Sequence, residues 1–91
     1  MPQNDVQPPH VRIRCRFFAR YAEVLGTATH DLRLPAGSTV GAAVRSLREH
    51  LQGGQALPEV PLAAVNLEHV DHGHVLADGD ELALLPPLAG G

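Results

Sequence analysis

The most constraining feature of the sequence is a strict alternation of apolar residues and arginine between positions 11 and 17. The apolar residues occupy the odd positions and arginine the even ones: Val11, Ile13, Cys15 and Phe17 alternate with Arg12, Arg14 and Arg16. Successive side chains of a β-strand point to opposite faces, so the pattern predicts a strand with one apolar and one charged face. Any fold for this chain must bury the first face and leave the second in water.

The length of the chain limits the fold around this strand to one small domain. Its 91 residues lie within the range of single compact domains, and 44% of them are apolar, which is enough to form a core. Only Phe17, Phe18 and Tyr21 are aromatic, so the core must be aliphatic. The scarcity of aromatic rings also argues against a protein that stacks the bases of single-stranded nucleic acid.

A stripe of aliphatic residues in the middle of the chain predicts one amphipathic helix. Ser38 or Thr39 can accept hydrogen bonds from its first free amides, and Gly53 and Gly54 are expected to end it. The spacings of four, three and four residues fit one helical face: Val40, Val44, Leu47 and Leu51.

Short elements account for most of the remaining sequence. Residues 20–25 predict one or two helical turns ended by Gly26, and residues 29–34 predict a strand that pairs with the first. Further strands are expected at 61–65, 69–70 and 81–85, with turns at 66–68 and 78–80. Two strands, one main helix and then two or three strands predict an α+β fold of the β-grasp type, with a mixed sheet packed on one helix.

The two ends of the chain differ from the predicted domain, which spans residues 10–85. Residues 1–9 are polar and hold three prolines, so we expect a mobile N-terminal tail. Residues 86–91 begin with Pro86 and Pro87, which lack the amide that a central strand needs, and are expected to form a flexible tail. Such a tail reaches about 20 Å, and Gly90 and Gly91 let it enter a narrow channel of another protein.

The tail points to chemistry at the carboxyl group of Gly91. A carboxylate is a poor electrophile, so acyl chemistry requires prior activation, for which adenylation by ATP supplies a good leaving group. A sulfur donor could then convert such an acyl-adenylate into a thiocarboxylate. The chain has no phosphate-binding loop of P-loop spacing, so a partner would have to perform the activation. The alternative for a terminal Gly-Gly pair is an ordinary frayed end.

Four short motifs occur along the chain: FFA at 17–19, AVN at 64–66, LADGDE at 76–81 and PPLAGG at 86–91. In this order and spacing they resemble the molybdopterin synthase small subunit, a ubiquitin-like sulfur carrier, and the resemblance covers residues 11–91. The resemblance implies that a ubiquitin-activating-like adenylyltransferase uses ATP to adenylate Gly91, which then becomes a thiocarboxylate. It also implies that the tail enters the synthase large subunit in a heterotetramer and donates sulfur to cyclic pyranopterin monophosphate. The carrier itself would hold no cofactor and have no active site.

Three residues are candidates for binding these partners. Phe18 shares the parity of the strand arginines, and Leu85 has the opposite parity to Leu82 and Leu84, so both should face away from the helix. Neighbouring first and last strands would then form an exposed apolar patch beside the tail. The resemblance assigns partner docking to the positions of Phe18 and Leu85, and to a position that is often apolar in the family and is His69 here.

Two other groups are interpreted as structural. His69, Asp71, His72 and His74 lie within six residues, but their spacing in a glycine-containing loop does not preorganise a tetrahedral metal site, so we expect solvated loop histidines and no bound metal. Cys15 shares the parity of Ile13 and is expected to be a buried small apolar residue.

Charge is distributed unevenly along the chain. Residues 1–48 hold seven arginines and three acidic residues, a net charge of +4, whereas residues 49–91 hold seven acidic residues and no basic one, a net charge of −7. The acidic half disfavours nucleic acid and could attract a basic protein, unless these are ordinary solvated residues. A single cysteine, no apolar run of about 20 residues and no secretory signal lead us to expect a cytoplasmic protein without membrane association.

Three functions follow from different classes. The first is the sulfur carrier of molybdopterin synthase. The second is a carrier for thiamine thiazole synthesis or tRNA thiolation, which shares the tail chemistry but has another acceptor. The third is a ubiquitin-like modifier or interaction module, in which Gly91 is joined to lysine or is never activated.

Overall fold

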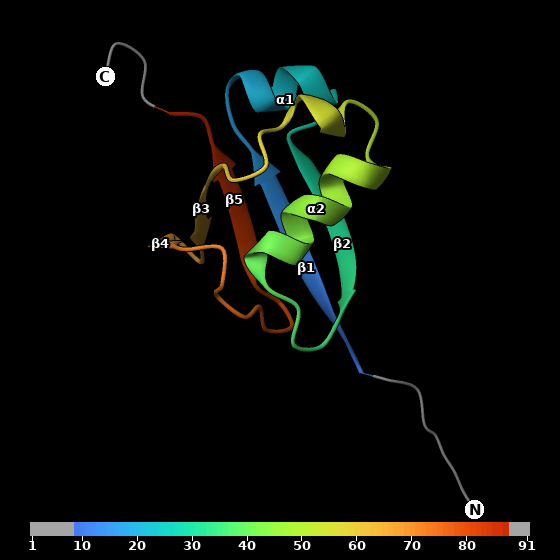
Figure 1. Ribbon diagram of the computed structural model, residues 1–91, viewed down its shortest axis with the longest axis vertical. Coiled ribbons are helices and arrows are strands. Elements are labelled where there is room, and N and C mark those ends of the chain that lie inside the picture. The colour runs from blue at the N-terminus through green and yellow to red at the C-terminus, as the bar shows by residue number, and fades with distance from the viewer. Residues whose placement is uncertain (1–8, 88–91) are drawn as a thin grey trace, which may run out of the picture.

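A five-stranded mixed sheet organises the molecule, with the strand order β2-β1-β5-β3-β4 (Figure 1). The computed structural model describes residues 9–87, so nearly all of the expected N-terminal tail, together with Gly90 and Gly91, lies outside the described residues. The strands are β1 (His10–Phe17), β2 (Thr29–Pro35), β3 (Leu62–Val65), β4 (Glu68–Val70) and β5 (Glu81–Leu85). β1 pairs antiparallel with β2 and parallel with β5, and β3 pairs antiparallel with both β5 and β4. The predicted α+β arrangement is therefore confirmed.

One long helix, α2 (Val40–His50), crosses one face of this sheet, and the short helix α1 (Arg20–Leu25) lies at the end where β1 finishes (Figure 1). α2 begins as predicted, because the Thr39 hydroxyl oxygen accepts a hydrogen bond from the Ala42 amide at 3.2 Å. α1 ends at Gly26, whose φ of 73° is the left-handed conformation that glycine adopts without strain.

The predicted role of Gly53 and Gly54 is wrong. α2 already ends at His50, and Leu51 at its C-cap is extended and only partly buried. Gly54 instead begins the 3-10 helix η1 (Gly54–Ala56), where a side chain would collide with the Leu47 carbonyl of α2. A glycine is needed there because η1 approaches α2 closely, which local sequence does not reveal.

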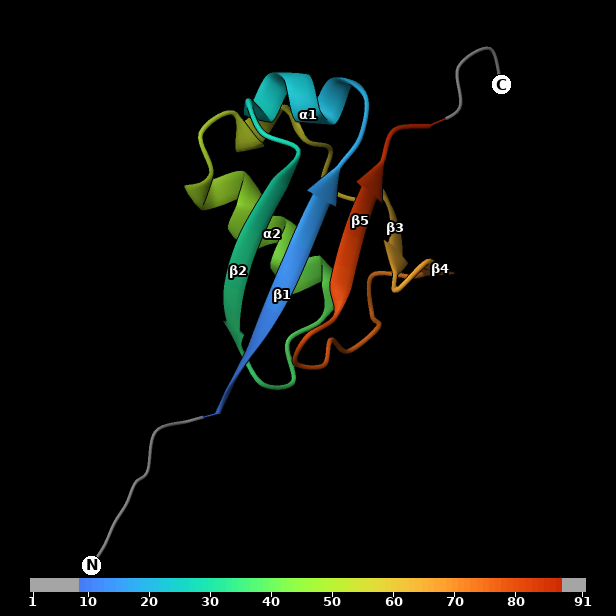
Figure 2. The same ribbon diagram turned by 180° about the vertical axis from the view of Figure 1, so that it is seen from behind.

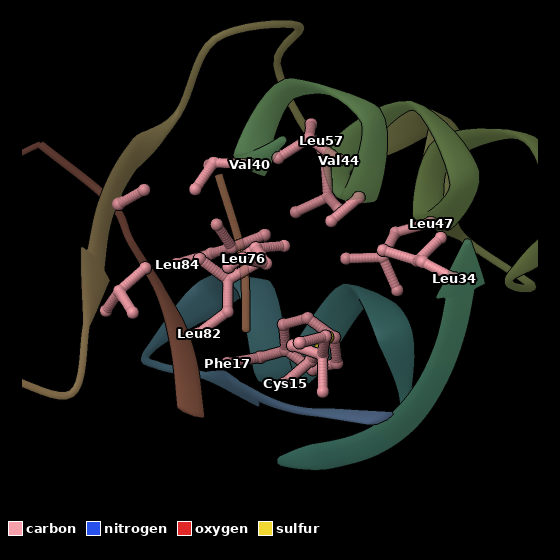
Figure 3. Close-up of a cluster of buried hydrophobic side chains, with 14 of the residues drawn as sticks. Cys15, Phe17, Leu34, Val40, Val44, Leu47, Leu57, Leu76, Leu82 and Leu84 are labelled. Atoms are coloured by element: carbon pink, nitrogen blue, oxygen red, sulfur yellow. The ribbon is translucent and has the colours of Figure 1, made fainter. Parts of the chain in front are cut away.

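The core fills the space between α2 and the sheet (Figure 3). The β1 residues alternate between exposed and buried, with the apolar members facing α2 and the arginines facing water. Among the described residues, no polar or charged residue is buried. The largest side chains that are almost completely buried come from both layers: Ile13, Leu47, Leu57, Leu82, Leu84, Val40, Val44 and Cys15. The core is therefore aliphatic, as its composition predicts.

Side-chain hydrogen bonds of the turns define where β5 begins. The Asn66 side chain donates to Asp80 Oδ1 at 2.9 Å and accepts from the Glu81 amide at 3.0 Å. Asp80 also accepts from the Ala77 amide at 2.8 Å. In the predicted turn at 78–80, the Gly79 amide donates to the Arg12 carbonyl at 2.8 Å. These contacts connect the β3–β4 turn, the start of β5 and β1, and so set the position of the strand that leads into the C-terminal segment.

No helix in the described part of the chain is both long enough and apolar enough to cross a membrane.

The two faces of the sheet should differ in their contribution to stability. We expect Leu84→Ala to lower the free energy of unfolding by about 2–5 kcal/mol, because Leu84 is completely buried. Leu62→Ala is the matched control on the neighbouring strand, where the side chain is 50% exposed, and should cost about 1 kcal/mol or less. Urea unfolding of both variants measures the difference. Equal losses would contradict the assignment of the two faces.

Candidate functional site

The C-terminal segment leaves the domain from the middle of the sheet. β5 ends at Leu85, between β1 and β3, and Pro86 and Pro87 continue the chain outside any strand. The prediction that the prolines do not extend the strand is therefore confirmed. Gly90 and Gly91 follow outside the described residues, so their proposed chemistry has to be argued from the sequence.

Figure 2 shows the sheet from the face turned away from α2. An apolar patch lies on this face, beside the exit of the C-terminal segment. Phe17, the last residue of β1, is paired with Leu84, so Phe18 directly after β1 and Leu85 at the end of β5 lie at the same end of the two neighbouring strands. Leu85 is in turn paired with Leu62 of β3. Phe18 is 39% exposed, Leu62 is 50% exposed and Leu85 is partly buried. We call these three residues the tail-root patch.

Leu62 is the member of the tail-root patch that sequence reasoning missed. Its parity within β3 is opposite to that of the buried Ala63 and Val65, so the alternation carried a signal. That signal was weak in the sequence because alanine occupies both parities, at Ala63 and Ala64. The pairing with Leu85 assigns Leu62 to the patch, and this pairing joins strands that lie far apart in the sequence.

His69 lies on the same face, one row away from the patch. It is exposed on the edge strand β4 and is paired with Ala64, which is paired on its other side with Ala83. Arg16 completes this row through its pairing with Ala83. The structure thus brings the three predicted partner-binding residues, Phe18, Leu85 and His69, to one face, with two small alanines between His69 and Arg16.

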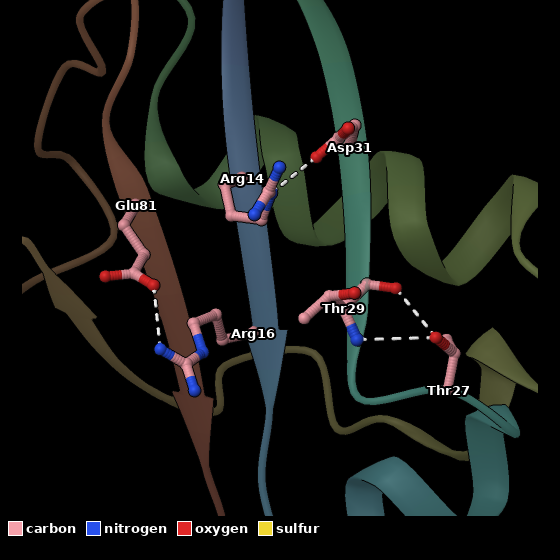
Figure 4. Close-up of polar contacts among 6 residues, drawn as sticks. All are labelled: Arg14, Arg16, Thr27, Thr29, Asp31 and Glu81. Atoms are coloured by element: carbon pink, nitrogen blue, oxygen red, sulfur yellow. Dashed lines mark hydrogen bonds and ion pairs between the residues drawn. The ribbon is translucent and has the colours of Figure 1, made fainter.

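Arg16 links the apolar patch to the charged part of the face. Its guanidinium Nη1 lies 3.1 Å from Glu81 Oε2 (Figure 4), and its Cζ atom lies 5.6 Å from the centroid of the Phe18 ring. A cation over an aromatic face is attracted by the negative charge of the ring system. Arg16 therefore helps to orient Phe18 toward the solvent side of the sheet.

Folding pairs some of the charges that are separated along the chain. Arg14 Nε donates to Asp31 Oδ1 at 2.7 Å (Figure 4), and this hydrogen bond raises the pKa of the Arg14 guanidinium. Arg48 lies 3.8 Å from Glu59. Together with the Arg16 contact, these pairs join arginines of the first half to acids of both halves. Ion pairs in the folded protein therefore offset part of the charge difference between the two halves of the chain.

The loop histidines differ from one another. His69 and His74 are exposed as expected, but the expectation is wrong for His72, which is partly buried with its Nε2 atom 2.7 Å from the Pro61 carbonyl. The carbonyls of His72 and His74 accept hydrogen bonds from Gly41 and Val40 at the start of α2. Residues 9–87 contain no group of three or more His, Cys, Asp or Glu side chains arranged to hold a metal ion. In this loop, His72 holds the backbone against β3 and α2.

Cys15 is a core residue. Its side chain is fully buried, and burial raises the pKa of the thiol to about 12. A thiol with such a high pKa holds almost no thiolate at neutral pH, so it is a poor nucleophile. Burial and a raised pKa are thus the properties of a structural cysteine, as the sequence predicts.

Solved structures identify the class. SAMP1 from Haloferax volcanii superimposes with a TM-score of 0.77 at 31% identity, covering 88% of this chain and 99% of that chain. A complex of subunits 1 and 2 of the molybdopterin-converting factor from Helicobacter pylori shares the fold, with a TM-score of 0.64 at 24% identity, covering 89% and 100% of the two chains. The mixed sheet, the single main helix and the exposed C-terminal exit define a ubiquitin-like β-grasp protein.

The chain belongs to the ThiS family, which matches residues 15–91, and is a ubiquitin-like sulfur carrier. The molybdopterin synthase sulfur carrier subunit of Aedes aegypti is 35% identical over 98 residues, covering 100% of both chains. Small archaeal modifier protein 3 of Haloferax volcanii is 33% identical over 92 residues, covering 89% of this chain and 100% of the relative. The resemblance inferred from the four motifs is therefore confirmed. Some relatives are named as carriers and others as modifiers, so the molecule that receives the sulfur from this chain is a separate question.

Burial of Cys15 should make stability depend on pH in the alkaline range. The folded state keeps the thiol proton up to a pKa of about 12, whereas the unfolded state loses it near 9.0. The contribution of this thiol to the free energy of unfolding is fully present below about pH 9. Above that pH it falls by about 1.4 kcal/mol per pH unit until the folded thiol ionises. Urea unfolding of the wild type and Cys15→Ala between pH 7 and pH 11 measures this loss, which the variant should lack. The same alkaline slope in both proteins would contradict the assignment.

Proposed function

We propose that this protein is the sulfur carrier subunit of molybdopterin synthase, with the Gly91 carboxyl group as its only reactive centre. The observation that carries the proposal is the full-length similarity to a relative of that name, joined to a family match that extends to residue 91. The acceptor is cyclic pyranopterin monophosphate, which receives sulfur inside the large subunit. The chain acts as a carrier that partner enzymes activate and discharge.

The activation consists of two substitutions, the first at the α-phosphorus of ATP and the second at the terminal acyl carbon. A Gly91 carboxylate oxygen attacks the α-phosphorus of ATP, pyrophosphate leaves, and a mixed anhydride with AMP forms. A sulfide-level donor then attacks the acyl carbon, and AMP leaves with its electron pair, so one oxygen of the original carboxylate is replaced by sulfur. A ubiquitin-activating-like adenylyltransferase supplies the phosphate-binding site and the catalysis. The carrier contributes an accessible end without side chains.

The geometry at the exit of β5 supports this division of labour. Pro86 and Pro87 lack backbone amides, so this part of the segment cannot donate to a neighbouring strand and remains available to a partner. β5 itself is held on both sides by β1 and β3, which gives the segment a rigid base. A partner enzyme can therefore bind the domain and take the tail into its own active site at the same time.

The tail-root patch is the proposed docking surface for both partners. Phe18 and Leu62 are substantially exposed apolar residues beside the exit, and burying them in an interface would remove that apolar area from water. Leu85 adds to this contact, and His69 provides a polar group at its margin. With the large subunit we propose a heterotetramer of two carriers and two large subunits. The complex of subunits 1 and 2 of the Helicobacter pylori molybdopterin-converting factor, whose matched chain shares this fold, supports a second subunit as the partner.

A modifier is the second candidate function. The relatives named small archaeal modifier proteins favour it, because they combine similar sequences with the same fold. In that function Gly91 is joined to a lysine amine, and the adenylate is attacked by nitrogen in place of sulfur. Carriers for thiazole synthesis or tRNA thiolation would share the thiocarboxylate and differ only in the acceptor.

We place the protein in the cytoplasm, because its single cysteine, Cys15, is a buried free thiol that fits a reducing compartment.

Intact-mass measurement tests the carrier proposal directly. The full chain is incubated with the adenylyltransferase, ATP and a sulfide donor, and we expect the mass increase of one oxygen replaced by sulfur. Addition of the large subunit and cyclic pyranopterin monophosphate should then return the original mass and yield molybdopterin. Removal of Gly91, or addition of one residue after it, should abolish both changes while leaving urea unfolding unaltered.

The other outcomes separate the alternatives. Loss of sulfur to tRNA or to a thiazole precursor, but not to the pyranopterin, would assign a different acceptor. Conjugates with lysine in place of a thiocarboxylate would support the modifier. An unchanged mass with an adenylyltransferase that is active on another carrier would overturn the carrier proposal.

Phe18→Asp should weaken partner binding more than folding. Phe18 lies on the open face of the sheet, so a carboxylate there remains solvated in the free domain but would be buried in the complex. We expect a loss of about 2 kcal/mol or more in affinity for the large subunit, and a loss of about 1 kcal/mol or less in unfolding free energy. Calorimetric titration and urea unfolding measure the two quantities.

Leu67→Asp is the matched control for this substitution. Leu67 is 91% exposed in the β3–β4 turn, at the opposite end of β3 from the tail-root patch, so its replacement should leave affinity unchanged. Equal effects of the two variants on affinity would argue against docking at the patch. Unfolding of Phe18→Asp alone would show that Phe18 belongs to the core.

A further inference from the structure

Two arginines face each other across the pair of strands β1 and β2. The antiparallel register pairs Arg12 directly with Arg33, on the same open face of the sheet as the tail-root patch. Like charges at directly opposite positions of a sheet repel each other and oppose folding. The fold therefore keeps an arrangement that does not benefit its own stability.

The acids nearby are already engaged. Asp31 is paired with Arg14 at 2.7 Å, and Asp78 Oδ1 accepts the backbone amide of Arg12 at 2.7 Å. Within residues 9–87 the arginines that form ion pairs are Arg14, Arg16 and Arg48. The guanidinium groups of Arg12 and Arg33 thus have no carboxylate within ion-pair distance in the described part of the chain.

The two arginines also line a hollow. A surface depression of about 370 Å³ lies between β1 and β2, and Arg12, Arg14 and Arg33 are among its walls, with Asp31 as the acidic group. Each guanidinium offers a planar set of N–H donors that fits the two oxygens of a carboxylate. A concave surface with three guanidinium groups and one carboxylate carries an excess of positive charge, although the chain as a whole has a net charge of −3.

We propose that the Arg12–Arg33 pair docks a segment bearing Asp or Glu on the protein partner that covers the tail-root patch. The inference rests on the proposed function, because it needs a partner bound at that patch. A carboxylate placed between the two guanidinium groups forms charge-assisted hydrogen bonds with both and relieves their repulsion. The bound complex thereby gains an interaction that the free domain lacks.

Continuity with the tail-root patch favours a protein over other anions. Arg12 lies in β1 and precedes Phe18, the residue directly after this strand, by six residues, which is about 20 Å at the rise of a β-strand. A standard interface covers about 800 Å² per partner, which corresponds to a footprint about 30 Å across. One partner can therefore cover both features. Nucleic acid is disfavoured because the seven acids of residues 49–91 repel its phosphates.

Charge reversal with a matched control tests the proposal. Binding of the full chain to the large subunit and to the adenylyltransferase is measured by surface plasmon resonance for the wild type, Arg33→Glu, Arg33→Lys and Arg45→Glu. Arg45→Glu introduces the same change of net charge at an exposed position of α2, on the other side of the sheet. Salt at about 0.05 M and about 0.5 M shows whether a difference is electrostatic, because the higher concentration screens exposed charges.

We expect Arg33→Glu to weaken binding of at least one partner by about tenfold or more at low salt. Arg33→Lys keeps the charge but not the planar donor set, so it should lose less affinity than Arg33→Glu. Arg45→Glu should change the affinity less than about twofold. High salt should reduce the gap between Arg33→Glu and the wild type. The melting temperature of Arg33→Glu should stay the same or rise, because the substitution removes the repulsion with Arg12. A loss of affinity without loss of stability is a result that a purely structural role does not produce.

Equal affinities of Arg33→Glu and Arg45→Glu for both partners would overturn the inference and leave the proposed function intact. Failure of the wild type to bind either partner, together with an unchanged mass in the thiocarboxylation assay, would overturn both. Binding of a fluorescent DNA oligonucleotide that is lost in Arg33→Glu and kept in Arg45→Glu would assign the pair to nucleic acid and also reject the proposal.

Discussion

The parallel pairing of the first and last strands is the constraint on which the rest of the molecule depends. It places β5 beside β1 with Phe17 opposite Leu84, and the intervening chain must cross over to make this possible. α2 lies in that crossover and covers the apolar face of the pair. The same pairing brings the exit of the C-terminal segment next to Phe18. The core and the candidate site therefore follow from one register.

One face of the sheet contributes to stability, and the other carries the candidate binding surface. Leu84 and Leu85 are consecutive residues, yet the first is completely buried under α2 and the second lies on the open face with Phe18 and Leu62. The buried residues that the structure describes are all apolar, so the core needs no polar network and tolerates a changing outer surface. The proposed function, in which an activating enzyme and an acceptor enzyme bind the carrier in turn, fits this separation, because the binding surface can be specialised without altering the fold.

Features of the open face that do not favour the isolated domain are consistent with a binding surface. Phe18 and Leu62 expose apolar area, and Arg12 opposes Arg33. Each of these unfavourable features is relieved when a partner with an apolar surface and a neighbouring carboxylate covers the sheet. Arg16 lies between the two regions and contacts Phe18 as well as Glu81, so it couples the apolar and the charged part of the surface. The residues of the open face that we propose for partner binding therefore contribute little to the stability of the fold.

The sequence by itself determined the features that depend on neighbouring residues. The alternation in β1, the helical stripe of α2, a cap at Ser38 or Thr39 and the turn at 78–80 follow from short-range periodicity and local hydrogen bonding, and the four motifs identify the family. Only the tertiary structure decided which residues of different strands meet: Leu62 with Leu85, Arg12 with Arg33, Gly54 with the Leu47 carbonyl and His72 with Pro61. The physical reason is that periodicity specifies the face on which a side chain lies, whereas register and close approach arise from contacts between distant segments after the core has formed.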